Sequence, residues 1–365
     1  MSEGLGSADE GAVGFWPTVW QRVRPEPGST QGWRSLGLIV ILAGLMISVD
    51  VTNSQFFSAA NIDVLLGNMV MLGIASVGMT LLIISANVDL SIGSMFAMVA
   101  CMTGLLSLSI NPDLAFFLAI PIAGGFGLLN GTLVWRIRIS PLVITLGFLT
   151  LYQGVSELVT NGAYVQNLPQ AFTYFGQGKW FGVDIPVVVL VVVVLVGHLV
   201  LSRTTLGRHI YAIGGNREAA ELTGIRVRRI VIGLFVVNAM LIGLAAALET
   251  SRFDAASIQF GTNLALQTIT AVILGGVAFT GGEGSIFGVI LAVTVLTMMN
   301  AALISFNVNP FWSDVLTGAL LLVAVSLDQL TQERREHYRK AQALREFRES
   351  HPATLDPTAV TGAGS

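Results

Sequence analysis

Residues 65–110 read LLGNMVMLGIASVGMTLLIISANVDLSIGSMFAMVACMTGLLSLSI, and Asp89 is their only charged side chain. A membrane-spanning helix needs about 20 consecutive, mostly apolar residues. The runs 65–86 and 91–110 both meet this length. Only a few polar residues separate them, so the stretch predicts two membrane helices joined by a very short connection.

Apolar runs of the same kind continue on both sides of this stretch. The chain of 365 residues is 53% hydrophobic and 11% charged, whereas soluble proteins carry about 25% charged residues. We therefore predict an all-α, polytopic membrane bundle of about ten helices. The other expected spans are 36–52, 114–135, 141–160, 185–202, 230–249, 264–281, 285–304 and 311–329. Glycines at 275, 276, 281 and 282 interrupt one of these runs, which predicts a broken or re-entrant element there.

The distribution of Lys and Arg predicts the topology. With ten spans, one side of the membrane receives three basic residues before the first span, Arg136 and Arg138, six between 203 and 229, and six from Arg334 onward. The opposite side receives only Lys179 and Arg252. Because cytoplasmic loops carry the excess of basic residues, both termini are expected in the cytoplasm.

Three regions follow from this pattern. We expect a disordered cytoplasmic tail at 1–34, a transmembrane unit at 35–330 with a cytoplasmic loop at 203–229, and a charged, helical cytoplasmic tail at 331–365. The first apolar run is interpreted as a retained anchor, since further spans follow it. The single cysteine, Cys101, excludes an intrachain disulfide, and the four scattered histidines suggest no metal or cofactor site.

The cytoplasmic loop contains a short helix with its own end signals. Asn216 is a suitable N-cap, Glu218 lies in the first turn, and Gly224 closes the helix. Ala219, Ala220 and Leu222 offer a small apolar face. The loop is either a basic connection that obeys the positive-inside pattern or a helix that docks into a groove of a soluble partner.

Polar residues near and within the spans are candidates for a translocation path: Asn68, Asn87, Asp89, Ser91, Asn130, Gln153 and Gln267. Asp89 either caps the third helix or, with Asn87 and Ser91, lines a cavity that binds hydroxyl groups. We expect most other polar residues within spans, including Asn238, to form interhelical hydrogen bonds. No carboxylate is expected at the centre of a span. The aromatic residues of the exterior loop 161–184 suggest either an interfacial belt or a docking surface.

Several segments resemble one family of transport proteins. The Glu218–Ala219–Ala220 string followed by Gly224 is similar to the EAA motif of bacterial ABC importer permeases, and GRHIYAIGGNREAAELTGI, which includes Gly215, resembles the corresponding loop of the ribose-type permeases. Three further segments agree in order and spacing with that family: GMTLLIISANVDLSIGSMFA at 78–97, SPLVITLGF at 140–148 and TAVILGGVAFTGGEGSIFGVILA at 270–292. The resemblance covers residues 60–329.

The resemblance implies a multi-pass inner-membrane permease that imports a monosaccharide or related polyol. It implies three partners: a separate ATP-binding subunit that contacts residues 215–224, a periplasmic or lipid-anchored sugar-binding protein, and a second permease copy, identical or similar. No cofactor or enzymatic activity is implied. Consistently, no GxxxxGK[ST] phosphate loop occurs. Ala265 and Gln267 stand where the family usually carries Glu and Asp; if those carboxylates bind the solute or the solute-binding protein, this chain differs in ligand or partner at that point.

Two alternatives from other classes remain. An ion-gradient-driven carrier of a small polar solute would need membrane-embedded carboxylates and commonly has an inverted repeat, neither of which the sequence suggests. A membrane enzyme would need a cluster of catalytic side chains, and none is evident.

Overall fold

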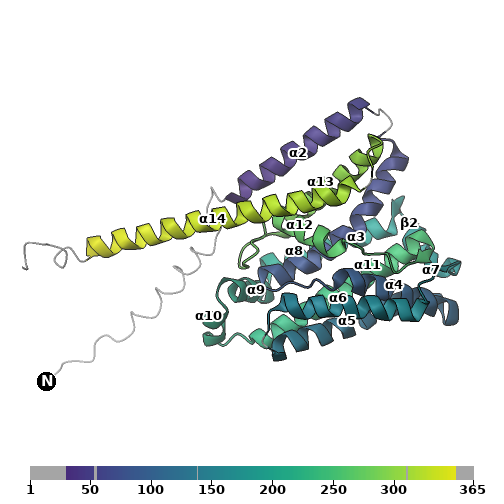
Figure 1. Cartoon of the computed structure of the whole chain (residues 1–365), viewed down its shortest axis with the longest axis horizontal. Helices are drawn as coiled ribbons and strands as arrows, with labels where there is room; N and C mark the ends of the chain where they lie inside the picture. Colours follow the sequence, from purple (N-terminus) through teal and green to yellow (C-terminus); the bar gives the residue numbers. More distant parts are fainter. Residues whose placement is uncertain (1–29, 53–55, 138, 310, 351–365) are drawn as a thin grey trace, which may run out of the picture.

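A computed structural model of the chain describes residues 30–52, 56–137, 139–309 and 311–350 (Figure 1). Most of the predicted N-terminal tail and the last part of the charged tail lie outside these residues. The long helices are α2 (Thr30–Thr52), α3 (Ala59–Ile84), α4 (Ile92–Ser109), α5 (Pro112–Ile137), α6 (Pro141–Thr160), α8 (Ile185–Arg203), α11 (Val227–Phe253), α13 (Ile286–Ser305) and α14 (Trp312–Ser350). Shorter elements are α7 (Gln170–Gln177), α9 (Thr205–Gly215), α10 (Arg217–Leu222), α12 (Leu264–Leu274), β1 (Val165–Gln166), β2 (Lys179–Trp180), β3 (Val183–Asp184) and β4 (Ala255–Ala256).

Each of the ten predicted apolar runs contains a helix, which confirms the all-α polytopic bundle. Eight of these helices are long and apolar enough to cross a membrane. The apolar part of α2, Leu36–Val51, and α12 are shorter. The number of crossings and the cytoplasmic position of the termini therefore stay predictions. Beyond the last span, α14 continues as one helix to Ser350, in agreement with the charged helix expected there.

The centre of the bundle is formed by α3 and α4. In the span of α3, 83% is buried inside the protein, compared with 17% in the span of α14. Apolar side chains on α5, α6 and α8 remain exposed, among them Leu128, Leu146 and Val192. Such a surface suits contact with lipid. The helices α3 and α4 thus form the interior of the bundle, and α5, α6, α8 and α14 lie at its edge.

Small residues bring α5 and α11 into close contact. A Cβ atom at Gly127 of α5 would lie 2.5 Å from the Phe235 carbonyl oxygen, and one at Gly243 of α11 would lie 2.5 Å from the Ala119 carbonyl oxygen. Glycine at these positions permits the two backbones to approach, a common basis of helix association in membranes.

Two elements start or stop inside the bundle. After α3 ends at Ile84, residues 85–91 lead into the interior, and α4 begins where Gly93 contacts Gly261. The eleven-residue α12 measures only about 16 Å, half of the roughly 30 Å hydrocarbon layer. The prediction of a broken element is confirmed, but its helix ends at Leu274 and not at residue 281. A Schellman motif with Gly276 in the left-handed region ends it, because the Val277 and Gly276 amides donate to Val272 and Ile273.

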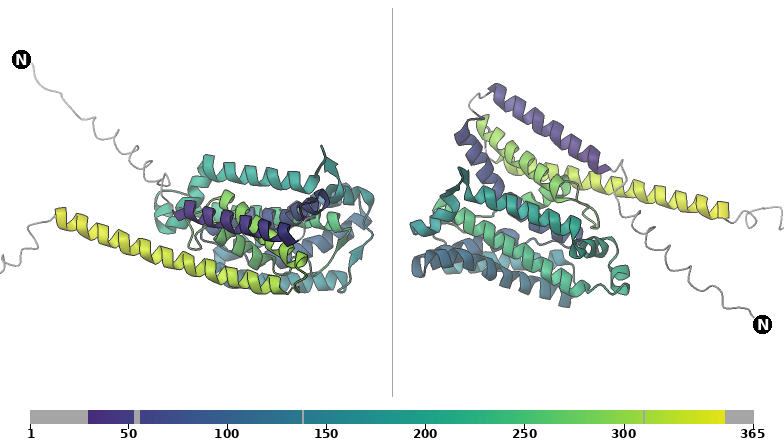
Figure 2. Two further views of the ribbon diagram at one scale, coloured as in Figure 1. Left: turned by 90° about the horizontal axis from the view of Figure 1, so that it is seen from above. Right: turned by 180° about the vertical axis from the view of Figure 1, so that it is seen from behind.

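The two ends of the bundle differ in their short elements. At one end lie α7 and two antiparallel strand pairs, β1 with β4 and β2 with β3. At the other end lie α9 and α10 (Figure 1). The last part of α14 extends beyond the bundle at this second end, as both views of Figure 2 also show. The basic loop 203–229 and the charged helix therefore share one end, as the charge count predicts.

Candidate functional site

The short helix α10 is closed at both ends as predicted. The Asn216 side chain accepts a hydrogen bond of 2.9 Å from the Ala219 amide, and Glu218 lies in the first turn. At the other end Gly224 has φ +83°, and the Gly224 and Ile225 amides donate to the carbonyls of Glu221 and Ala220. These two bonds form a Schellman motif, so the ends of this six-residue helix are fixed by local hydrogen bonds.

The predicted apolar face of α10 is divided between inside and outside. Ala220 is buried against the core, whereas Leu222 is 89% exposed, and Ala219 and Glu218 are also exposed. The expectation of one outward small-residue face is therefore wrong for Ala220. On a helix, residues two apart point in different directions, so Ala220 anchors α10 while Leu222 protrudes.

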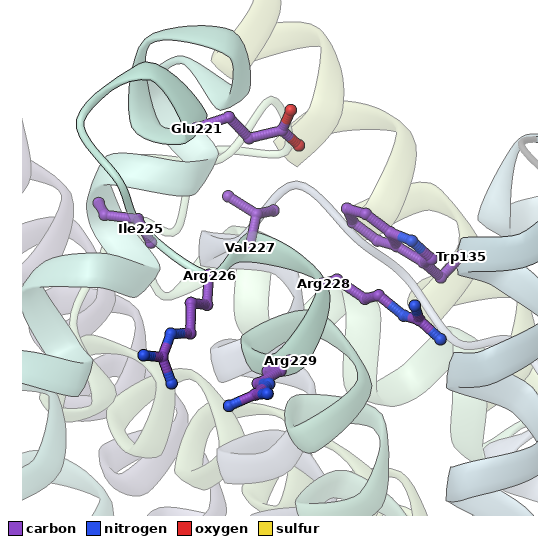
Figure 3. Close-up of a pocket in the computed structure, with 7 residues that line it drawn as sticks. All are labelled: Trp135, Glu221, Ile225, Arg226, Val227, Arg228 and Arg229. Atoms are coloured by element: carbon purple, nitrogen blue, oxygen red, sulfur yellow. The ribbon is translucent and has the colours of Figure 1, made fainter.

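A pocket of about 410 Å³ lies beside α10 (Figure 3). Glu221 lies on one side of it, and the guanidinium groups of Arg226, Arg228 and Arg229 lie on the other. Arg217 pairs with Glu221 at 3.6 Å and stacks 4.5 Å above the ring of Trp135 from α5. The surface around α10 is thus open and strongly basic.

Three candidate path residues form one buried cluster. The Ser91 amide and hydroxyl donate to the Asp89 carboxylate at 2.9 and 2.6 Å, and the Asn130 amide group donates to the Ser91 hydroxyl at 2.8 Å. The Asn130 oxygen accepts a bond of 2.6 Å from the hydroxyl of Tyr152 on α6. All four side chains are at most 1% exposed. The cluster therefore joins the start of α4 to α5 and α6.

This geometry corrects the expected position of Asp89. The sequence predicts it between two spans at the cytoplasmic end, where it either caps the third helix or lines a cavity with Asn87 and Ser91. Instead Asp89 lies beside residues within α5 and α6, and its carboxylate binds Ser91, the N-cap residue, instead of an amide in the first turn of α4. A carboxylate does lie deep inside the bundle, although in a connection and not in a span. Tyr152 was not anticipated, because a tyrosine in an apolar run carries no distinguishing signal.

The remaining path candidates lie apart from this cluster. Asn68 accepts bonds from Arg252 at 3.2 Å, and Gln153 donates to Glu157 at 3.0 Å. Asn87 is buried and bonds to Ser85 in its own connection. Gln267 is half-buried on α12. The seven candidates therefore do not form one continuous lining.

Asn238 contradicts the expectation of interhelical bonding. It lies fully buried on α11, and neither of its side-chain amide atoms has a partner among the described residues. Its neighbour is Gly78 of α3, where a Cβ atom would lie 2.5 Å from the Asn238 oxygen.

At the opposite end, the loop 161–184, which is predicted to be exterior, is tied to α11. The Ser251 hydroxyl donates to the Phe172 carbonyl and accepts from the Gly176 amide, both at 2.6 Å, which fixes α7. Lys179 bonds to Asp63 and Asp184, and these hydrogen bonds raise the pKa of Lys179. At the tip of the β2–β3 hairpin Phe181 is fully exposed. Exposed aromatic side chains such as Phe181 and Trp180 thus lie on a loop that hydrogen bonds and ion pairs hold in place.

A glycine-rich turn next to α9 was also not anticipated as part of the site. We define the glycine turn as residues 278–284. Tyr211 of α9 donates a hydrogen bond of 2.7 Å to the Gly284 carbonyl, and the Gly282 amide donates at 2.8 Å to the Ile84 carbonyl. Burial raises the pKa of Tyr211, so its hydroxyl remains a donor at neutral pH.

In the part of the chain that the structure describes, no group of three or more His, Cys, Asp or Glu side chains is placed to hold a metal ion. Cys101 is a free, buried thiol in α4.

Comparison with known proteins agrees with this architecture. Residues 61–325 match the family described as branched-chain amino acid transport system / permease component. The ribose import permease protein of Bacillus subtilis is 32% identical over 81% of this chain and 93% of its own length. The corresponding ribose protein of Escherichia coli K12 is also 32% identical, over 83% of this chain and 96% of its own.

A third relative is the L-arabinose ABC transporter permease protein of Azospirillum brasilense, 31% identical over 82% of this chain and 88% of its own. No solved structure matches the chain. The family match spans most of the bundle, and eight of its helices are long and apolar enough to cross a membrane. The protein is therefore a multi-pass inner-membrane permease component that belongs to this family of transport-system permeases.

Proposed function

We propose that this permease imports a monosaccharide or related polyol and is driven by a separate ATP-binding subunit of an ABC importer. The observation that carries the proposal is α10, a short, end-capped and exposed helix in the basic loop at one end of a bundle of this family. The permease does no covalent chemistry in this account. A solute-binding protein delivers the solute from the other side.

The substrate class is supported by the relatives. Two of them are named for ribose and one for L-arabinose, both of which are pentoses. The family description, in contrast, names branched-chain amino acids. Uptake of radiolabelled D-ribose, L-arabinose and L-leucine by cells with and without the transporter compares these classes. We expect uptake of a sugar, and uptake of leucine alone would overturn the sugar assignment.

We propose that α10 contacts the ATPase through Gly215, Asn216, Glu218, Ala219, Ala220 and Gly224. In this proposal five of the six residues divide into two roles. Glu218 and Ala219 are exposed and available for contact, whereas Asn216, Ala220 and Gly224 hold the helix in shape. Leu222, which is 89% exposed, is an additional contact that fits an apolar groove. The coupling loop at 203–229 of the predicted unit 35–330 would then lie on the ATPase side of the membrane. The charged tail at 331–365 would lie on the same side.

For the path itself we propose two different roles. Asp89, Ser91 and Asn130 use their polar groups on one another, which supports a role in holding the start of α4. Gln267 on the broken helix α12 is only half-buried, and broken helices form the solute sites of many transporters. Asn68, Asn87 and Gln153 stay candidates of the same kind. Because importers of this type surround one path with two permeases, we propose a pair of identical or similar chains.

The proposal is tested by reconstitution. The tagged permease is purified with its associated subunits, inserted in liposomes, and supplied with the binding protein and radiolabelled D-ribose or L-arabinose. We expect uptake that requires ATP on the side of the liposome membrane that α10 faces, and we expect Glu218→Arg to abolish it. ATP-independent uptake that follows an ion gradient, with Glu218→Arg fully active, would instead identify the secondary carrier.

A further inference from the structure

The glycine turn, residues 278–284, lies between α9, which precedes α10 in the chain, and the broken helix α12. Residues 275–277 connect it to the end of α12, and it leads into α13, whose first turn is capped by Ser285. Within the turn, the Ala278 amide donates to the Glu283 carbonyl at 3.1 Å, and the Gly281 amide donates to Ala278 at 3.0 Å. These two bonds close the backbone of the turn on itself.

Its contact with α9 is made without intervening side chains. A Cβ atom at Gly214 would overlap the Ile84 carbonyl oxygen and lie 2.5 Å from the Gly282 amide nitrogen. A Cβ atom at Gly282 would lie 3.0 Å from Gly215. Gly281 and Gly282 have φ of +89° and +77°, a conformation that other residues adopt only with strain. Three backbones therefore meet at one point, and close packing transmits displacement well.

Tyr211 adds a directional bond beside this contact. Its hydroxyl donates to the Gly284 carbonyl at 2.7 Å, from the same helix that carries Gly214. Only Asn216 separates α9 from α10. Between α10 and the turn there are thus only Asn216, the helix α9 and one hydrogen bond.

The far side of the turn is held by α14. The Phe279 amide donates to the Asp328 carboxylate at 3.2 Å, and Asp328 also accepts from Gln332 at 2.8 Å. Asp328 is 5% exposed. The turn is therefore bonded to α9, to α14 and to the last residue of α3, and residues 275–277 join it to the end of α12.

From these contacts we propose that Tyr211 and Gly214 are positioning residues that pass movement of α10 through the glycine turn to α12 and to the end of α3. The inference rests on the proposed function, in which α10 contacts an ATPase. It adds the route by which that contact reaches the broken helix. Physical continuity alone does not demonstrate coupling, so the test measures movement of α12 directly.

The test uses the intact complex of permease and ATPase. Cys101 is replaced by alanine, and Gln267→Cys introduces one thiol on α12. Its rate of labelling by a water-soluble maleimide is compared without nucleotide and with ATP and vanadate, and ATPase association is measured in parallel. In this background we expect the rate to change at least about threefold on trapping, and Tyr211→Phe to remove most of that change while leaving the ATPase bound.

Two further variants complete the design. Gly214→Ala should act like Tyr211→Phe, whereas Gly233→Ala on α11, where a Cβ atom meets nothing within 4 Å, should leave the labelling change intact. An unaltered labelling change in both Tyr211→Phe and Gly214→Ala would overturn the inference, as would a parent complex in which trapping does not affect the thiol. Absence of any bound ATPase from the parent chain would instead refute the proposed function, and with it the premise of this inference.

Discussion

Two fully buried asparagines provide a matched test of the polar cluster. Asn130 makes bonds of 2.8 Å to Ser91 and 2.6 Å with Tyr152, and a longer one of 3.4 Å to Asp89. Asn238 has no partner among the described residues. Both side chains are 0% exposed. Replacing each with alanine removes the same atoms, so the two substitutions differ chiefly in the hydrogen bonds that they break.

The expected magnitude follows from the two short bonds of Asn130. Hydrogen bonds between membrane helices contribute roughly 0.6 to 1.7 kcal/mol each. Asn130→Ala should therefore lower the free energy of unfolding by about 1–3 kcal/mol relative to Asn238→Ala, in which an unpaired amide is removed. At about 2 °C per kcal/mol for a chain larger than 250 residues, the difference in Tm is about 2–6 °C.

The single cysteine supplies the assay. Cys101 lies fully buried in α4, the helix whose start the cluster holds. A fluorogenic maleimide reacts with it only when the bundle opens, so the fluorescence of detergent-solubilised protein during heating reports the transition. Tyr152→Phe, which removes one hydroxyl, should give an intermediate shift. Equal losses for Asn130→Ala and Asn238→Ala, or a larger loss for Asn238→Ala, would refute the structural role assigned to the cluster.

Four further outcomes follow from the structure. Gly224→Val places a β-branched residue at φ +83° and should cost α10 about 1–2 kcal/mol, measured as weaker retention of the ATPase during purification. Asn216→Ala removes the cap and should weaken the same retention less, by about 1 kcal/mol; an effect larger than that of Gly224→Val would contradict this order. Gly127→Leu should clash with Phe235 and sharply lower the yield of monodisperse protein, whereas Gly125→Leu, which faces open space, should not. Because hydrogen bonds raise the pKa of Lys179 above 10.5, its pairing with Asp63 is present at neutral pH and is lost only as the pH rises through that raised value. At pH 7 the backbone amides of residues 179–184 should therefore exchange hydrogen faster in Lys179→Gln than in the parent protein.

The helices were predictable because hydropathy alone marks them. A run such as 185–202 has no alternative to a membrane helix, and α8 occupies Ile185–Arg203. The ends of α10 were predictable for a different reason, since Asn216 and Gly224 act on backbone groups a few residues away. Local signals of this kind need no knowledge of the rest of the fold.

The depth of Asp89 could not be read from the sequence. The connection 85–91 is short, and a short connection between two apolar runs normally lies at the membrane surface. Here the contact of Gly93 with Gly261 and the bonds to Asn130 place it inside the bundle. Both depend on which helices pack together, which hydropathy does not report.

The roles of Tyr152 and Tyr211 were hidden for the same reason. Each forms one hydrogen bond to a group distant in sequence, to Asn130 and to the Gly284 carbonyl. A tyrosine in an apolar or basic segment is equally typical of an interfacial position. The opposite holds for Asn238. A polar residue in a span predicts an interhelical hydrogen bond, but the packing of α3 and α11 provides no partner for this side chain among the described residues.

The central claim is that α10 is the contact through which an ATPase drives this permease. The most direct measurement is to tag the chain in its native membrane, solubilise it gently, and quantify the co-purifying proteins by mass spectrometry, for the parent and for Glu218→Arg and Gly224→Val. The account predicts an ATP-binding subunit in amounts equal to the permease, lost in Glu218→Arg and reduced in Gly224→Val, while membrane insertion stays normal in both. A permease that purifies without any ATPase, and that alone moves solute down an ion gradient in liposomes, would contradict it.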